Sequence, residues 1–189
     1  MSNYWRHRIS RLPDCSTGNL PRKHLLESEE VDWFDLTFHD NWTRIYEMLC
    51  RIMGERAEAE DLALEAFWRL YTKPPKSRDN LSGWLYRVAS NLGINALRAR
   101  HRRNYYEAFS DLETHGQPYP NPEDESERLE LLGKVQITLA RMKPKSAQLL
   151  ILRHSGLSYS ELSEATGISF SSIGKMLSRA EDEFKRLYL

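Results

Sequence analysis

Arginines gather in the middle of the chain, where their charge could hold the phosphates of a nucleic acid. From Asn80 to Tyr106 there is no acidic residue, and the five arginines of this stretch are Arg87, Arg98, Arg100, Arg102 and Arg103. Cations along a nucleic-acid backbone supply much of the binding free energy and make binding sensitive to salt. Successive positions spread around a helix axis, so only some of the five can face one phosphate track. The cluster is also compatible with a solvated helix end beside the C-terminal dipole.

A second set of polar side chains lies near the C-terminus in a pattern typical of a helix-turn-helix. Ser158 and Glu161 fit a capping box, which predicts the start of a short helix. Gly167 ends this helix, and Ser169 can cap a second one with an apolar stripe of Ile173, Leu177, Ala180, Phe184 and Leu187. The outward side chains are then Ser171, Ser172, Lys175, Ser178 and Arg179. Such short donors and cations reach base edges and phosphates in the major groove. A structural helical hairpin with a solvated face is the alternative.

The sequence gives no sign of catalysis or of metal binding. None of the six histidines forms an H-x-x-x-H pair, and there is neither a glycine-rich phosphate loop nor a G-x-S-x-G motif. Cys15 and Cys50 lie far apart without a C-x-x-C, so we expect neither a zinc site nor a disulfide framework. Glu58, Asp61 and Glu65 form an acidic stripe that is more typical of a solvated surface than of a metal site. We therefore expect no enzyme, no catalytic residue, no metal and no cofactor.

Composition limits the class of protein. The 189 residues include 27 Lys and Arg against 27 Asp and Glu, which excludes a uniformly basic coat but leaves room for basic faces. Five Trp and nine Tyr favour a folded chain over a disordered one. The longest apolar run, Leu149 to Leu152, is far short of a membrane span, and the N-terminus lacks the apolar stretch of a secretory signal. We expect a cytoplasmic protein without a membrane partner.

The elements that position these residues are predicted to be helices in two domains. Apolar residues recur at helical spacing in three groups: Trp42, Ile45, Leu49 and Ile52; Leu62, Ala66, Phe67 and Leu70; and Leu81, Leu85, Val88 and Leu92. Asn80 is the expected N-cap of the third helix.

Prolines 118, 120 and 122 stand in an acidic stretch that should not be helical. The predicted fold is all-α, with two small helical domains joined by an acidic Pro-containing linker, the second a helix-turn-helix. The boundaries are 1–31 for an N-terminal arm, 32–104, 105–126 for the linker, and 127–189.

Adjacent aromatic residues must point to different faces of these helices. Phe67 continues the apolar stripe and is predicted to be core, so Trp68 should be exposed and available to a protein partner. Trp84 and Tyr86 differ by about 200° around a helix. Trp84 is predicted to pack in the core, and Tyr86 to face a partner.

Three segments carry distinctive motifs in a fixed order. Residues 59–70 read Ala-Glu-Asp-Leu-Ala-Leu-Glu-Ala-Phe-Trp-Arg-Leu. Residues 84–91 read Trp-Leu-Tyr-Arg-Val-Ala-Ser-Asn and are followed by Asn95 and Arg98. The third segment runs from Gly167-Ile168-Ser169 through Ser172-Ile173 to Leu177-Ser178-Arg179-Ala180.

Together these motifs resemble bacterial RNA polymerase sigma factors of the compact, two-domain extracytoplasmic-function (ECF) type, over about 36–104 and 127–189. The first is similar to the family's clamp-docking helix, with Leu64 in place of the usual Gln. The second is similar to the promoter-opening helix, with Asn95 where Asp is common. In the third, which is similar to the reader of the upstream element, Gly174 and Met176 replace the usual Lys and Arg.

The resemblance implies a role for each domain. Residues 32–104 would be a sigma region 2 that binds core polymerase and melts the minus-ten element, and 127–189 a sigma region 4 that binds the minus-thirty-five element. The implied polymerase-binding residues are Glu58, Asp61, Leu64, Glu65 and Trp68. The implied minus-ten contacts are Lys76, Ser77, Arg78, Asn80, Tyr86, Arg87, Asn91, Asn95, Arg98, Arg102 and Arg103. The implied minus-thirty-five contacts are Ser169, Ser171, Ser172, Lys175, Ser178 and Arg179.

The expected function is that of a dissociable transcription initiation subunit. Its partners would be core RNA polymerase, promoter DNA as duplex and as single strand, and an anti-sigma factor of the kind common in the family. The alternative is a stand-alone helix-turn-helix regulator or a sigma-like interaction protein that does not initiate, which Gly174 and Met176 favour because they weaken the basic character of the reading helix. The acidic linker is either a solvated spacer or an occupant of a nucleic-acid channel.

Overall fold

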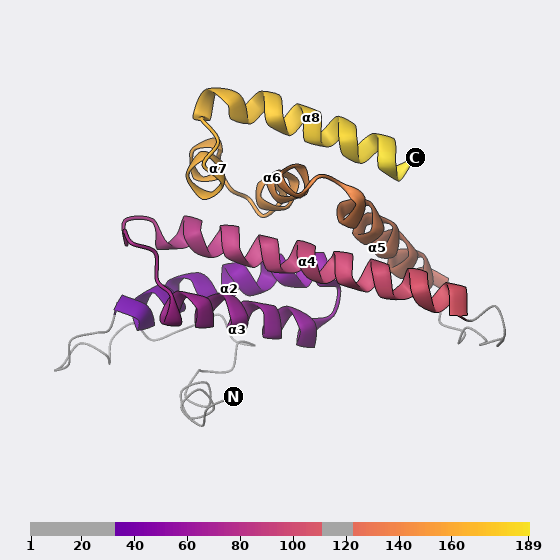
Figure 1. Ribbon diagram of the computed structural model, residues 1–189, viewed down its shortest axis with the longest axis horizontal. Coiled ribbons are helices and arrows are strands. Elements are labelled where there is room, and N and C mark those ends of the chain that lie inside the picture. Colours follow the sequence, from indigo (N-terminus) through magenta and orange to yellow (C-terminus); the bar gives the residue numbers. More distant parts are fainter. Residues whose placement is uncertain (1–32, 111–122) are drawn as a thin grey trace. The chain divides into compact units, whose positions relative to one another are not determined.

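The structure is a computed structural model that describes residues 33–110 and 123–189 (Figure 1). Within these ranges it contains helices and no strand, which confirms the all-α expectation there. The first three described helices are α2 (Trp33–Met53), α3 (Arg56–Thr72) and α4 (Leu81–Ser110). None of the helices in the described ranges combines the length and the apolar composition that crossing a bilayer takes. The predicted arm at 1–31 and the central part of the predicted linker lie outside the described residues.

An aromatic cluster holds α2 against α3. The rings of Phe38 and Phe67 lie 4.7 Å apart between centroids, and Phe38 stacks on Trp42 at 5.0 Å. Phe67 is fully buried, as predicted, together with Ile45 and Leu49 of α2. Such aromatic pairs add to the stabilisation that comes from apolar burial alone. The turn between the helices uses Gly54 at φ +72°, a backbone conformation that favours glycine.

Helix α4 begins as the sequence predicts. The Asn80 side-chain oxygen accepts a hydrogen bond of 2.6 Å from the backbone N–H of Gly83, which satisfies a donor that has no partner within the helix. Leu85, Ala89 and Leu97 are buried and form the apolar side of the helix. The helix continues to Ser110, past the expected boundary at 104.

The C-terminal half contains α5 (Glu123–Arg141), α6 (Pro144–His154), α7 (Tyr159–Thr166) and α8 (Phe170–Tyr188). Helix α5 begins within the stretch expected to be linker. Glu183 of α8 accepts hydrogen bonds of 2.8 Å from the Lys143 backbone N–H and from the Ser146 hydroxyl, which fixes α8 at the start of α6. The helices of this half also contact α4, through α5, α6 and α7.

The turn between α7 and α8 confirms the predicted helix-turn-helix. Ser158 and Glu161 form the full capping box, and Gly167 ends α7 in the left-handed region at φ +71°. The Ser158 backbone N–H and hydroxyl both hold the pKa of Glu161 below its ordinary value. Ser169 occupies the N-cap position of α8 without a side-chain capping bond, and its hydroxyl donates to the Ser172 hydroxyl at 2.8 Å.

Replacing the capping serine should destabilise the helix-turn-helix. We expect Ser158→Ala to lower the free energy of unfolding by about 1 kcal/mol, since one of the donors at the start of α7 loses its partner. The pKa of Glu161 should rise toward its ordinary value. A carboxyl whose folded-state pKa is lowered stabilises the fold above its ordinary pKa, and this stabilisation is lost as the pH falls through the lowered value.

Urea denaturation and a carboxyl titration by NMR measure the two effects. The matched control is Ser178→Ala, because Ser178 is an exposed serine on α8. Equal losses of stability in the two variants would contradict a capping role for Ser158.

Candidate nucleic-acid interface

Five of the predicted minus-ten residues on α4 lie on one side of the helix. Arg87, Asn91, Asn95, Arg98 and Arg102 follow one another at steps of four, four, three and four, the spacing that places side chains on one helical face. All except Arg98, which is half-buried, are exposed. We call these five residues the α4 stripe. Three arginines and two amides on one face suit a strand that offers phosphates and base edges.

Part of the α4 stripe is in contact with the C-terminal half. The Gln148 amide nitrogen of α6 donates to the Arg87 carbonyl (3.2 Å), the Ser90 hydroxyl (3.0 Å) and the Asn91 side-chain oxygen (3.1 Å). The Arg98 guanidinium donates to the Ala140 carbonyl (3.1 Å) and the Met142 carbonyl (2.7 Å) at the end of α5. In this arrangement the functional groups of Asn91 and Arg98 already have partners, whereas Asn95 and Arg102 are exposed to solvent.

Arg100 and Arg103, the other arginines of the cluster near the end of α4, have different surroundings. The Arg100 guanidinium pairs with the Glu58 carboxylate of α3 and donates to the Gln136 side chain at 3.3 Å. It therefore connects α3, α4 and α5 and does not face outward. Arg103 is exposed beside Arg102. The prediction that only some of the five arginines can share a face is confirmed.

The loop before α4 holds the other predicted minus-ten residues. Lys76, Ser77 and Arg78 are exposed, and the Arg78 guanidinium lies 4.2 Å from the centre of the Trp33 ring in a cation–π contact. The Ser77 hydroxyl donates to the Asp79 carboxylate. Asn80 caps α4 through its oxygen and donates through its nitrogen to Glu164 of α7 at 2.7 Å. The oxygen and the nitrogen of the Asn80 side-chain amide therefore both have hydrogen-bond partners.

The prediction that Tyr86 of α4 faces a partner is wrong. Tyr86 is only 3% exposed, and Trp84 is half-buried. The Tyr86 ring lies beneath the Arg44 guanidinium of α2 at 5.6 Å, and burial raises the pKa of its hydroxyl. Tyr86 is covered because α2 packs across this side of α4, a contact between segments distant in sequence. Tyr86 therefore has no surface to offer to a DNA strand.

The predicted polymerase-binding residues occupy α3. Asp61 is exposed, Leu64 is half-buried, and Trp68 is 42% exposed, as expected from its position beside the buried Phe67. Two carboxylates of the set are paired: Glu58 with Arg100, and Glu65 with Arg69 at 2.8 Å. The charge that this face can offer to a basic partner comes mainly from Asp61.

Sequence reasoning missed two exposed apolar residues, one of them beside Trp68 on α3. Tyr71 is 43% exposed and stacks on Trp68 with 6.1 Å between ring centres, and Leu36 of α2 is 53% exposed. Tyr71 lies three positions after Trp68, so helical spacing could have revealed it. Leu36 could not have been found in this way, because it comes from another helix.

On α8, Ser171, Lys175, Ser178 and Arg179 are exposed as predicted, and Ile173, Leu177 and Ala180 are buried beneath them. The predicted contact residues Ser169 and Ser172 are joined by their hydrogen bond. Gly174 is not required by close packing, since a Cβ there would meet the Tyr159 ring at 3.7 Å, an ordinary contact. A further residue that the sequence did not single out, Phe170, is 63% exposed at the start of α8.

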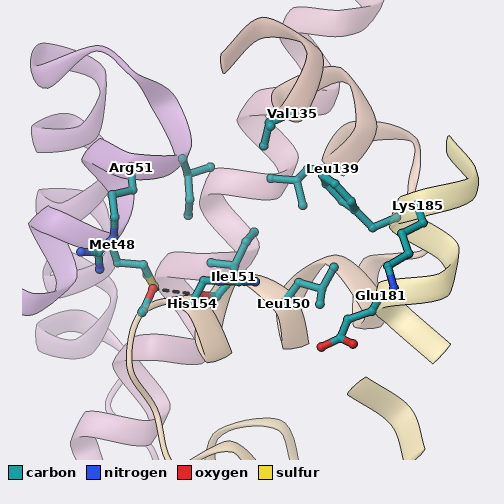
Figure 2. A pocket seen from close by; sticks show the side chains of 12 residues that line it. Met48, Arg51, Val135, Leu139, Leu150, Ile151, His154, Glu181 and Lys185 are labelled. Carbon is teal, nitrogen blue, oxygen red and sulfur yellow. Dashed lines mark hydrogen bonds between the residues drawn. The ribbon is translucent and has the colours of Figure 1, made fainter. Parts of the chain in front are cut away.

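An apolar cavity of about 440 Å³ lies where α2, α5, α6 and α8 meet (Figure 2). Met48, Val135, Leu139, Leu150 and Phe184 contribute apolar side chains to its wall. Charged residues also line it: Arg51, Glu181 and Lys185. Within the part of the chain that the structure describes, no group of three His, Cys, Asp or Glu side chains is placed to hold a metal ion.

The Gln148 contact can be tested by changing its donor to an acceptor. Gln148 is 7% exposed, and its amide nitrogen faces three oxygen atoms. We expect Gln148→Glu to lower the free energy of unfolding by about 1 to 3 kcal/mol at neutral pH, since a buried carboxylate cannot donate to these oxygens. The new carboxyl should have a raised pKa, so the loss should shrink as the pH falls and the group becomes protonated.

Urea denaturation at several pH values measures this effect. Gln148→Met is the control of similar size without a charge and should show no such pH dependence. If both variants are as stable as wild type at every pH, the amide donor does not hold α6 against α4.

Comparison with known proteins shows that residues 38–103 match the Sigma-70 region 2 family. The ECF RNA polymerase sigma factor SigW of Bacillus subtilis is 29% identical over 153 residues, which cover 76% of this chain and 82% of that protein. The ECF RNA polymerase sigma factor SigE of Mycolicibacterium smegmatis is 26% identical over 144 residues, or 75% and 56% of the two chains. A solved structure of the sigma factor RpoE with the anti-sigma factor NepR from Bartonella quintana covers 82% of this chain and 95% of that chain, at 18% identity and a TM-score of 0.46.

Proposed function

We propose that the chain is an RNA polymerase sigma factor of the ECF type whose surfaces divide the work of initiation, a proposal supported by its match to Sigma-70 region 2 over residues 38–103 and by its similarity to SigW and SigE. A sigma factor binds core polymerase, recognises promoter DNA and promotes strand opening. The observation that carries the proposal is the α4 stripe, which lies inside the matched region 2 and presents arginines and amides on one face. The chain acts by binding and contributes no catalytic group of its own. Its place of action is the cytoplasm, where core polymerase works.

Each interface has a distinct partner in this proposal. The α3 face around Asp61, Leu64 and Trp68 docks on core polymerase, with Tyr71 extending its apolar area. The α4 stripe and Lys76 hold the separated minus-ten strand, in which unpaired bases and phosphates are both accessible. Helix α8 enters the major groove of the upstream duplex, as second helices of this motif do. The resemblance adds an anti-sigma factor as a further partner.

The contacts of Gln148 and Arg98 imply that the protein changes conformation when a DNA strand binds to α4. Asn91 and Arg98 are hydrogen-bonded to α6 and to the end of α5, so a DNA strand that uses them has to displace these contacts. We therefore propose that α5 and α6 move away from α4 when the chain joins core polymerase. Free protein should then bind promoter DNA poorly.

Transcription with purified core polymerase from the source organism, followed by start-site mapping, tests the function itself. A sigma factor produces specific starts only when core polymerase and the chain are combined. A stand-alone regulator would bind duplex DNA without polymerase and would give no new start site, and that outcome would overturn the proposal.

The docking face is tested by Trp68→Ala. We expect binding to core polymerase to weaken about tenfold, since exposed Trp residues are often energetic centres of protein interfaces. Competition for core polymerase against wild-type chain measures the change. Tyr188→Ala is the control, because Tyr188 is another partly exposed aromatic residue at the far end of α8. An equal effect of both changes, or of neither, would count against this docking face.

The strand-holding face is tested by changing Arg87 and Arg102 together to Ala. The double variant should keep its affinity for core polymerase but form several-fold less open complex, measured by permanganate reactivity of unpaired thymines. Each phosphate contact removed should also lower the salt dependence of promoter binding by about one unit of slope. Arg186→Ala, at an exposed arginine of α8, is the control. Open-complex formation equal to wild type would exclude the α4 stripe as the strand-holding face.

A further inference from the structure

The first turn of α8 presents a large apolar side chain where a polar one is expected. Phe170 is the first residue of the helix and is 63% exposed. Ile173 and Leu177, which follow Phe170 in the helix, are buried, so the apolar side of α8 packs against the domain without this ring. The position of the ring carries the argument, because the N-terminal residues of the second helix of a helix-turn-helix are the ones that meet base edges.

The polar groups beside Phe170 in the first turn of α8 are serine hydroxyls, of which that of Ser171 is exposed. The hydroxyls of Ser169 and Ser172 are bonded to each other at 2.8 Å, and Gly174 has no side chain. The first cation of the helix is Lys175, and there is no acidic residue in the first turn to repel phosphates. Of the groups near the start of α8, the phenyl ring therefore has the largest surface for contact with a base.

The major groove offers an apolar group that suits such a ring. Thymine carries a 5-methyl group there, and apolar side chains such as Phe discriminate thymine by contact with it. The N-terminal residues of a recognition helix are also the ones that contact base edges.

We propose that Phe170 is a specificity-determining residue that packs against the 5-methyl group of a thymine in the upstream promoter element. This inference rests on the proposed function, since it requires α8 to lie in the major groove. Recognition here is by apolar contact, and it does not require the basic residues that Gly174 and Met176 replace.

Removing single methyl groups from the DNA tests the proposal directly. Holoenzyme is assembled from core polymerase and the full chain, and a promoter found by start-site mapping is prepared with each upstream thymine replaced in turn by deoxyuridine. This change keeps base pairing and removes only the methyl group. We expect one or two positions to show about fourfold weaker binding, the size of effect given by one methyl-sized group leaving apolar contact.

The same DNA series is then bound by holoenzymes that carry variants of the chain. Phe170→Ala should bind the thymine and deoxyuridine promoters equally, and Phe170→Leu should keep part of the preference for thymine. Tyr188→Ala should keep all of it. Circular dichroism of each variant establishes that α8 is folded, and binding to core polymerase is measured separately.

Three results would overturn the inference. One is an upstream element without a thymine, or one whose thymines all tolerate deoxyuridine in wild type. Another is a methyl preference that persists in Phe170→Ala. The third is a loss of core-polymerase affinity in Phe170→Ala with methyl preference unchanged, which would identify the ring as a protein-docking residue. Failure of wild-type holoenzyme to bind any promoter would instead overturn the proposed function.

Discussion

Helix α4 has to satisfy two demands along the same stretch of residues. One side carries Leu85, Ala89 and Leu97, which are buried in the bundle with α2 and α3. Another side carries the α4 stripe, whose arginines and amides have to be available to a DNA strand under the proposed function. Because both sides belong to one rigid helix, the core that holds α4 also fixes the spacing of the stripe. The aromatic cluster around Phe67 therefore contributes to the geometry of the stripe without touching it.

The contacts that cover part of the stripe are of a kind that a nucleic acid can replace. Arg98 donates to the Ala140 and Met142 carbonyls, which are neutral groups near the C-terminal end of α5. A phosphate carries a full negative charge, so it adds an attraction between opposite charges to the hydrogen bonds that the Arg98 guanidinium can make. Gln148 is likewise a neutral donor to neutral acceptors. These contacts can hold α6 on α4 while the stripe has no other partner. When DNA replaces them, a phosphate can take the place of the carbonyls as the partner of Arg98.

Local sequence signals predicted the helix boundaries better than the contacts between helices. Asn80, the Ser158–Glu161 capping box and Gly167 were identifiable because each acts within a few residues of itself. The exposure of Trp68 followed from one helical stripe. The burial of Tyr86 did not, because it depends on how α2 crosses α4. The partners of Gln148 and Arg100 also come from distant segments, and spacing within one helix carries no information about them.

The weak basic character of α8 fits a tethered reader better than an independent one. With Gly174 and Met176 in place of cations, the first three turns of α8 have Lys175 and Arg179 for phosphate contacts. An isolated domain with few such contacts binds DNA weakly at physiological salt. When the same chain also engages core polymerase and the opened strand, the upstream duplex is presented at an effective concentration that can reach millimolar values. Under that condition a modest contact is enough to select a sequence. A stand-alone regulator would have to obtain all of its affinity from α8 and its immediate surroundings, and the residues at these positions do not provide it.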